Sequence, residues 1–417
     1  MASLNSTRKT PAKPLGLVAW AMFDWANSAF TTVIITFVFA TYFAKGVVGD
    51  ETLGTSYWGY AMSLSGLCIA LLAPVFGAVA DMGGRRKPWI AGFTALCVAA
   101  TAMLVFIAPD PAYALPALIL VAIANIGFEM GIVFNNAMLP DIARSDRIGR
   151  ISGWAWGCGY AGGLACLVII LAFFDLGSTD HIRATALLVA AWFALFAVPL
   201  FLWTPDQPKT RIGFVRAVTD GLALLGRTLK GLRGQGNILR FLIAHMVYGD
   251  GLVTLFAMGG VFAQSAFGMT TNQVLQFAVA INVTAGLGAA AFGWIDDKIG
   301  PKPTIQIALV GLAALGVAIL TVHDVATFLI LGAALGIFVG PAQSASRSLL
   351  ARVVPQGQET EMFGLFALSG KATAFLGPLL FGLATAAFGS ARAGMATILV
   401  FFVAGALILF TVNVPRR

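Results

Sequence analysis

Long apolar segments recur along the chain, and short polar connections separate them. A helix of roughly 20 apolar residues crosses the hydrocarbon of a bilayer. The pattern therefore predicts twelve membrane-spanning helices, at approximately 14–44, 56–80, 87–107, 112–138, 151–174, 183–203, 238–267, 271–295, 303–322, 325–351, 361–388 and 392–412. We expect an all-α membrane protein in which these helices form two bundles of six.

One long polar stretch interrupts the apolar pattern and divides the chain into two halves. We expect an N-terminal six-helix bundle at 1–203, a cytoplasmic linker at 204–236 and a C-terminal six-helix bundle at 237–417. Composition agrees with a membrane protein, because 59% of the residues are hydrophobic and only 11% are charged. A soluble domain carries about 25% charged residues.

Basic residues predict the orientation of the chain, because short loops rich in Lys and Arg stay on the cytoplasmic side. Of the 26 Lys and Arg residues, 22 fall in the terminal segments and the loops of one side, whereas the other side has only Lys45, Arg183 and Arg392. Both termini are therefore predicted to be cytoplasmic. This asymmetry accounts for the net charge of +8, so nucleic acid is not an expected partner.

Several other classes of function find no residues to support them. The sequence contains no P-loop, zinc-ligand spacing or nucleophile elbow, so we expect neither an enzyme nor a bound metal or cofactor. The four cysteines fall inside predicted spans and are expected to pack rather than to form disulfides. The first apolar run is longer than a signal-peptide core, so we expect it to be retained. A monomer in a bacterial inner membrane, in contact with lipids, is the expected state.

A repeated loop motif relates the two halves. The segment "GAVADMGGRRK" places Gly77, Asp81 and Gly84 in the spacing that "GWIDDKIGPK" repeats 216 residues later with Gly293, Asp297 and Gly300. Glycines allow a tight turn, the acid can accept hydrogen bonds at a neighbouring helix start, and Arg85 and Arg86 can face anionic headgroups. A simple positively charged hairpin loop is the alternative interpretation.

The first of these loops resembles the signature loop of the major facilitator superfamily. Five further segments resemble its vacuolar amino-acid effluxer-like family, namely "FDWANSAF", "NNAMLPDIA", "YGDGLVT", "QSASRSLLARVVP" and "FGLFALSGKATAFLGP". The resemblance implies two bundles that alternate access to the two sides of the membrane. It also implies that Asp81 braces the start of span eleven, near 360–363. The second loop lacks the Arg pair of the first, which puts a symmetrical gating role for Asp297 and Gly300 in doubt.

Five ionizable residues lie deep in predicted spans, where charge is costly and usually functional. They are Asp24, Glu129, His245, Asp250 and Lys371. Counted from the cytoplasmic helix ends, the acids and the lysine lie roughly 14 to 20 Å deep in a hydrocarbon layer ~30 Å thick. We expect them to line a central cavity near the midplane.

Polar side chains accompany these charges at helical spacing, and we expect them to bind the substrate together with the acids and Lys371. They are Asn27, Ser28, Thr31, Asn125, Tyr160 and Tyr248. Three acids against one base leave two negative charges in excess, so at least one acid is expected to titrate. Asp24, Glu129, Asp250 and His245 are the proton-coupling candidates. A carboxylate and an ammonium in one cavity suit a zwitterion such as an amino acid or short peptide.

Alternative roles remain for most of these residues. Asp24 and Lys371 form a purely structural ion pair in one alternative, and Glu129 is a protonated hydrogen-bond donor in another. His245 is as well explained by packing, and Asp250 by a helix distortion next to Gly251. Arg347 and Arg352 are interpreted as interface anchors, Asn282 and Gln343 as interhelical contacts, and Pro378 as a bend. At the level of function, the alternatives are a multidrug or lipid exporter with a hydrophobic cavity and a membrane sensor.

Overall fold

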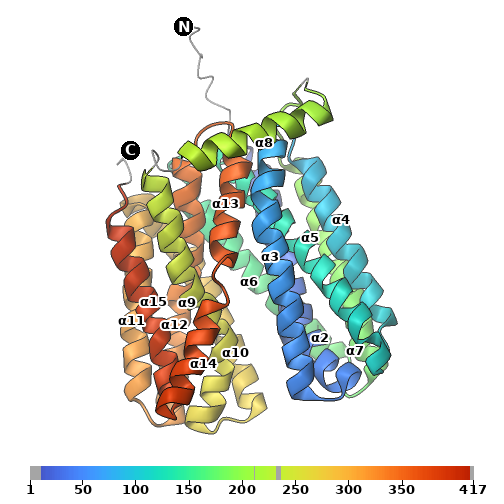
Figure 1. The fold of residues 1–417 in the computed structure, drawn as a ribbon, viewed down its shortest axis with the longest axis vertical. Coiled ribbons are helices and arrows are strands. Elements are labelled where there is room, and N and C mark those ends of the chain that lie inside the picture. The colour runs from blue at the N-terminus through green and yellow to red at the C-terminus, as the bar shows by residue number, and fades with distance from the viewer. Residues whose placement is uncertain (1–10, 211, 232–235, 414–417) are drawn as a thin grey trace.

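The computed structural model describes residues 11–210, 212–231 and 236–413. Within these ranges, twelve helical segments are long and apolar enough to cross a membrane. They form two bundles of six, one from each half of the chain (Figure 1). The helices are α1 (Pro14–Ala29), α2 (Phe39–Tyr42), α3 (Glu51–Gly83), α4 (Lys87–Met103), α5 (Ala114–Ile142), α6 (Ile148–Phe173), α7 (Thr179–Trp203), α8 (Phe214–Gly231), α9 (Gly236–Phe267), α10 (Thr271–Ile299), α11 (Pro301–Thr321), α12 (Val325–Val353), α13 (Glu359–Lys371), α14 (Leu376–Phe388) and α15 (Ala391–Phe410).

The first span is one continuous run of helical turns, Pro14–Val48, and ends four residues beyond its predicted end. After α1 it passes through a π-helical segment, Phe30–Phe37, then α2 and a second π-helical segment. The Thr36 hydroxyl donates to the carbonyl of Thr31, five residues earlier, which is the spacing of a π-turn. The hydroxyl of Thr36 thus bonds within the widened part of the helix.

Span eleven is broken, contrary to the continuous helix that the apolar pattern predicts. Residues 372–375 separate α13 from α14. Pro378 is not the bend that the sequence suggested, because it lies in the first turn of α14, where a missing N–H costs little. The break therefore lies before the proline, directly after Lys371.

The polar linker contains a helix that the sequence analysis did not anticipate. α8 is strongly amphipathic and lies across the ends of the bundles (Figure 1). Its buried residues Ala217, Leu225 and Thr228 recur at helical spacing, and Gly221 lies against the backbone of Val79 in α3. We call this end of the molecule the α8 side; it is the side that the basic residues predict to be cytoplasmic.

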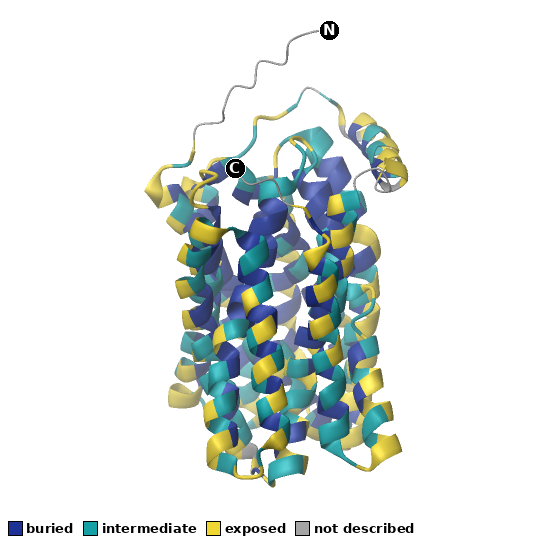
Figure 2. Cartoon of the chain, turned by 90° about the vertical axis from the view of Figure 1, so that its left-hand side faces the viewer, coloured by how far each residue is buried: buried dark blue, intermediate teal, exposed yellow. Residues whose placement is uncertain are grey.

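The two bundles contact each other mainly near the α8 side. There α13 packs on α3 and α6 packs on α10, and each crossing needs glycine. A Cβ at Gly77 would lie 2.5 Å from the carbonyl oxygen of Thr360, and one at Gly364 would lie 2.5 Å from that of Ala73. In Figure 2 the buried residues concentrate in this half of the molecule, whereas Figure 1 shows the bundles apart at the opposite end.

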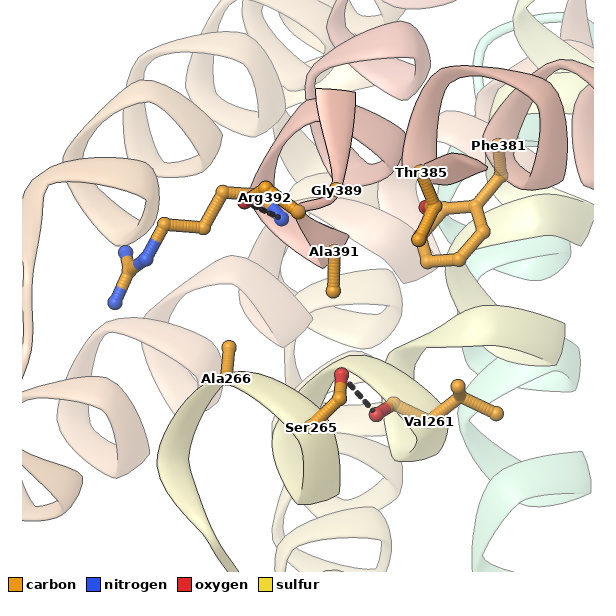
Figure 3. A pocket seen from close by; sticks show the side chains of 9 residues that line it. Val261, Ser265, Ala266, Phe381, Thr385, Gly389, Ala391 and Arg392 are labelled. Carbon is orange, nitrogen blue, oxygen red and sulfur yellow. Dashed lines mark hydrogen bonds between the residues drawn. The ribbon is translucent and has the colours of Figure 1, made fainter. Parts of the chain in front are cut away.

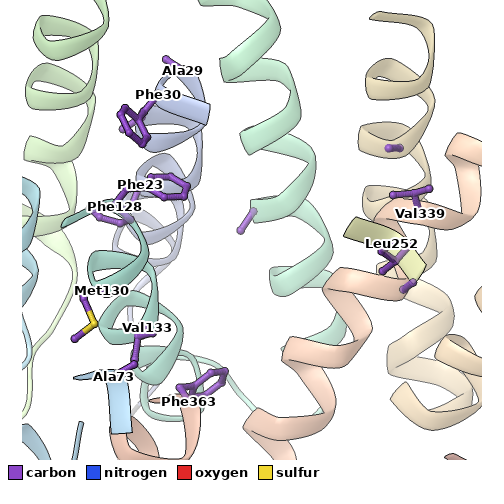
Figure 4. Packing of buried hydrophobic residues seen from close by; sticks show 14 of the residues in the cluster. Phe23, Ala29, Phe30, Ala73, Phe128, Met130, Val133, Leu252, Val339 and Phe363 are labelled. Atoms are coloured by element: carbon purple, nitrogen blue, oxygen red, sulfur yellow. The ribbon is translucent and has the colours of Figure 1, made fainter. Parts of the chain in front are cut away.

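Aromatic side chains fill the N-terminal bundle between α1 and α5 (Figure 4). The rings of Phe30 and Phe128 lie 5.4 Å apart, and Phe23 meets Phe193 of α7 edge to face at 5.7 Å. Burying such side chains fixes the orientation of α1. The packing thereby holds Asp24, the neighbour of Phe23, at the interface with the second bundle.

Candidate functional site

Arg347 of α12 crosses from the second bundle into the first. Its guanidinium donates to Asp24 Oδ2 at 2.8 Å, to Asn136 Oδ1 at 3.0 Å and to the hydroxyl and carbonyl oxygens of Ser152 at 2.9 and 2.7 Å. It also lies over the ring of Trp20, 5.0 Å from the ring centroid. All these partners belong to the first bundle, so this single side chain joins the two halves.

This arrangement corrects two expectations. Asp24 pairs with Arg347 and not with Lys371. Arg347 is not an interface anchor at the membrane surface, because only 3% of the residue is exposed. Arg352, one turn further along α12, does lie near the helix end, where it pairs with Asp296 and Asp297 at 3.2 and 3.0 Å.

Glu129 and Lys371 form a second ion pair between the bundles. Lys371 Nζ lies 2.6 Å from Glu129 Oε1. Both side chains are partly exposed, at 31% for Lys371 and 20% for Glu129. Counted along α13 and α5, the pair lies roughly 18 to 20 Å from the helix ends on the α8 side, near the middle of a bilayer. In this contact Glu129 accepts a hydrogen bond from Lys371, whereas the alternative interpretation made it a protonated donor; its role in proton coupling stays a prediction.

The charge count changes accordingly. The deep acids Asp24, Glu129 and Asp250 face two bases, Arg347 and Lys371, and not one. Two of these acids are paired, which leaves Asp250 as the single deep carboxylate without an ion pair among the described residues. Asp250 is 1% exposed, and its carbonyl accepts the hydroxyl of Thr254 at 2.7 Å.

The other predicted substrate-binding residues form hydrogen bonds outside the two ion pairs, some between helices and some within one helix. Asn125 donates to Ser65 at 2.8 Å, Tyr160 to Gln343 at 2.7 Å, and Tyr248 shares a hydrogen bond of 2.6 Å with Ser346. Ser28 donates to the carbonyl of Asp24, and Thr31 to that of Ser28, while Asn27 is 3% exposed. The interhelical role expected of Gln343 is confirmed by Tyr160, which lies in the other bundle. Asn282 instead bonds within its own helix.

His245 is enclosed by packing contacts. Its Nδ1 lies 2.8 Å from the hydroxyl of Ser369, and its ring stacks on Phe366 with centroids 3.9 Å apart. These contacts agree with the packing alternative for His245. Its proton-coupling role stays an untested prediction.

Asp81 of α3 caps the start of α13, as the family resemblance implied. Its two carboxylate oxygens accept the backbone N–H groups of Thr360 and Glu361 at 3.1 and 2.9 Å. A negative charge is favourable at this end of a helix, where the amides have no partner in the helix itself. Asp81 therefore binds the two bundles together on the α8 side.

Arg86 reinforces this contact. It pairs with Asp141 of its own bundle and with Glu359 of the other, the latter at 3.0 Å, and it donates to the Thr360 hydroxyl at 2.9 Å. Burial alone lowers the pKa of Arg86, but the carboxylates of Asp141, Asp81 and Glu359 outweigh it and raise that pKa. The guanidinium thus stays charged at this contact. Arg85, by contrast, is exposed.

The second loop repeats the contact geometry of the first, whereas a symmetrical gating role for the two loops stays a prediction. Asp297 of α10 accepts the backbone N–H groups of Gly149 and Arg150 at the start of α6, at 2.8 and 3.3 Å. Arg150 and Arg352 approach it at 2.7 and 3.0 Å. These arginines come from other segments, which explains why the loop needs no Arg pair of its own. Gly84 and Gly300 end α3 and α10 with φ of 80° and 94°, a region that favours glycine.

Replacing Asp81 or Asp297 with asparagine is expected to favour opening on the α8 side. Asparagine keeps the shape but loses the charge, and hydrogen bonds to a charged group are worth about 1.5–3 kcal/mol, or roughly a 10- to 100-fold change in population. Labelling of a cysteine placed at the buried Ser344, in a variant without the four native cysteines, measures this opening. Asp146→Asn, an exposed acid outside both contacts, is the control. Unchanged labelling in both gate variants would contradict the gating role.

Comparisons with known proteins identify the family of the chain. The family model described as "Vacuole effluxer Atg22 like" matches residues 45–417. The chain belongs to the Atg22-like family. It is 27% identical to the MFS-type transporter YxiO of Bacillus subtilis over 402 residues, 94% of this chain and 93% of that protein.

Solved structures show the same fold in other carriers. The human organic anion transporter MFSD10 matches with a TM-score of 0.73 at 16% identity, covering 96% of this chain and all of that one. The proton:xylose symporter XylE, a major facilitator superfamily protein, matches with a TM-score of 0.71 at 15% identity, covering 96% and 94%. This Atg22-like chain is therefore a multi-pass membrane transporter of the major facilitator type, and not an enzyme.

Two surface hollows of the Atg22-like chain lie away from both ion pairs. One, of about 440 Å³, lies between the ends of α9 and α14 and the start of α15 (Figure 3). Its Arg392 donates to the carbonyls of Leu320 and Val322 at 2.7 and 2.6 Å, so this cation stabilises the end of α11. The other, of about 850 Å³, lies beside Arg85 and Asp206 on the α8 side. Neither contains the deep charges that the sequence analysis singled out.

Proposed function

We propose that this chain moves a small zwitterionic solute, of the amino acid or short peptide class, by alternating access coupled to protons. The observation that carries the proposal is the Glu129–Lys371 pair. One acid and one base lie 2.6 Å apart, on opposite bundles and partly exposed, near the middle of the membrane. When the pair opens, Lys371 offers a partner to a carboxylate and Glu129 a partner to an ammonium group.

Proton coupling follows from the same two pairs in this proposal. Both acids lie on the first bundle and both bases on the second, so protonating either acid removes an attraction between the halves. Substrate binding replaces the attraction lost at Glu129, and protonation of Asp24 releases Arg347. The basic residues of the α8 side support an orientation with that side in the cytoplasm, in a bacterial inner membrane.

Uptake into proteoliposomes tests the proposal. An imposed pH gradient is expected to accelerate uptake of at least one labelled amino acid or dipeptide, and unlabelled zwitterions are expected to compete. Glu51→Gln, which alters an exposed pair with Lys45, is a control that should leave uptake unchanged. Transport of a lipid or hydrophobic drug without competition by amino acids would contradict the proposal and favour an exporter with a hydrophobic cavity.

A further inference from the structure

Asp250 is the one deep acid whose charge the two ion pairs do not balance. It lies on α9, and only 1% of the residue is exposed. Among the described residues, its Oδ1 atom has no hydrogen-bond partner and the side chain forms no ion pair. A carboxylate buried without a partner is costly. Either a proton or a bound cation must therefore neutralise Asp250.

The broken span eleven passes directly beside this carboxylate. A Cβ at Gly377, at the start of α14, would lie 3.0 Å from the carbonyl oxygen of Asp250. The hydroxyl of Thr373, inside the break, faces the Asp250 side chain. The Thr373 hydroxyl is itself buried, and apart from this contact with Asp250 it has no hydrogen-bond partner in the described part of the chain. Two buried oxygen-bearing side chains thus meet at one point.

The break also changes the backbone hydrogen bonds. The N–H of Ala374 reaches back only to Lys371, at 3.4 Å, and the N–H of Leu376 only to Thr373, at 2.7 Å. In a continuous α-helix, the N–H of Ala374 would donate to the carbonyl of Gly370, and the N–H of Leu376 to the carbonyl of Ala372. Carbonyl oxygens at the end of α13 are consequently available, and the negative end of a helix dipole points to the same region.

The chemistry of this set favours a small cation. All its members are oxygen atoms, and the carboxylate supplies one negative charge. Lys371, two residues before Thr373, cannot serve as the counter-ion while it holds Glu129 at 2.6 Å. Among the described residues no group of three or more His, Cys, Asp or Glu side chains forms a transition-metal site. Discontinuous helices in transporters bind coupling ions with such unwound carbonyls.

We propose that Asp250, Thr373 and the carbonyl end of α13 form a binding site for a monovalent cation of the size of Na⁺ or Li⁺. The site lies within the second bundle and is separate from the ion pairs between the bundles. An ion bound there would link the two segments of span eleven to α9. It would thereby fix the position of Lys371, the residue that ends α13.

Binding of Na⁺ to the purified full-length protein in detergent tests this site without any transport measurement. Thermal stability is expected to rise with Na⁺ or Li⁺, as for any ligand that binds only the folded state, and not when choline or K⁺ replaces them mole for mole. Direct binding of radioactive Na⁺ measures the affinity. Asp250→Asn and Thr373→Val should each weaken binding by roughly tenfold or more, whereas Thr373→Ser keeps the hydroxyl and should bind like the parent.

Glu129→Gln separates this inference from the proposed function. It is expected to bind Na⁺ as the parent protein does, although it loses the pair that carries substrate recognition. A failure of amino acid transport with intact Na⁺ binding would overturn the proposed function alone. Equal stability in Na⁺, K⁺ and choline would overturn the cation site, as would unchanged Na⁺ binding in Asp250→Asn. Stabilisation of the parent by acidic pH alone would also overturn it and assign Asp250 to a proton.

Discussion

Arg347→Ala is expected to reduce transport by about two orders of magnitude or more and to lower the melting temperature. The change leaves the buried Asp24 carboxylate without its cation and also empties the space over Trp20. Removing one partner of a buried ion pair costs roughly 3–5 kcal/mol. Uptake into proteoliposomes and thermal unfolding of the same preparation measure the two effects.

A double variant distinguishes loss of the charge pair from general damage. Asp24→Asn with Arg347→Gln removes both charges, so it should recover most of the melting temperature while transport stays low. Arg147→Ala, an exposed arginine on the same side, is the matched control and should behave like the parent protein. Normal transport by Arg347→Ala would show that the contact between the bundles at this point is dispensable.

The second large effect is expected at Glu129 and Lys371. Glu129→Gln and Lys371→Met should each lower uptake by roughly 10- to 100-fold, because a charge-assisted hydrogen bond is worth about 1.5–3 kcal/mol. Each single change also leaves a partly buried charge without its partner. Substrate competition curves, measured on the same proteoliposomes, report whether affinity or turnover is lost.

The double variant Glu129→Gln with Lys371→Met decides between a binding role and a structural one. If the pair binds substrate, the double variant regains stability but not transport. If the pair only joins the bundles, removing both charges restores transport as well. The exposed pair Lys45 and Glu51 provides the control, since neutralising both should change neither property.

The sequence predicted the fold well because membrane-spanning helices leave a simple signal. Each span had to be apolar over its length, and the repeated loop motif related the halves. The contact of Asp81 with the start of α13 was also predicted correctly. That expectation came from the family resemblance of the loop motif, because the motif alone does not indicate which helix Asp81 contacts.

The partners of the deep charges were harder to predict. Arg347 lies only six residues before the end of α12, roughly 9 Å, so its position suggested a surface anchor. Its burial depends on Ser152, Asn136 and Trp20, which come from three different helices of the other bundle. One signal in the sequence could have indicated that Arg347 faces the other bundle. Gln343, which was expected to make interhelical contacts, lies four residues before Arg347 and therefore on the same helix face.

Two features of local structure were missed for a different reason. Hydropathy averaged over span eleven does not detect a four-residue break between two apolar segments. α8 was missed because the linker is polar on average. Its apolar residues fall on one face only when the segment is arranged as a helix. For α8, the helical spacing of the apolar residues carried information that the average hydropathy of the linker did not.

The two carboxylate caps on the α8 side have a consequence for the environment in which the carrier works. The side chains of Asp81 and Asp297 are 1% and 3% exposed. Each accepts hydrogen bonds from backbone amides, whose partial charges do not depend on pH or salt. At 0.1 M, dissolved ions screen interactions between exposed charges that lie more than about 10 Å apart, but they screen buried contacts much less. If these contacts close the α8 side as proposed, the fraction of closed molecules should therefore hardly respond to ionic strength.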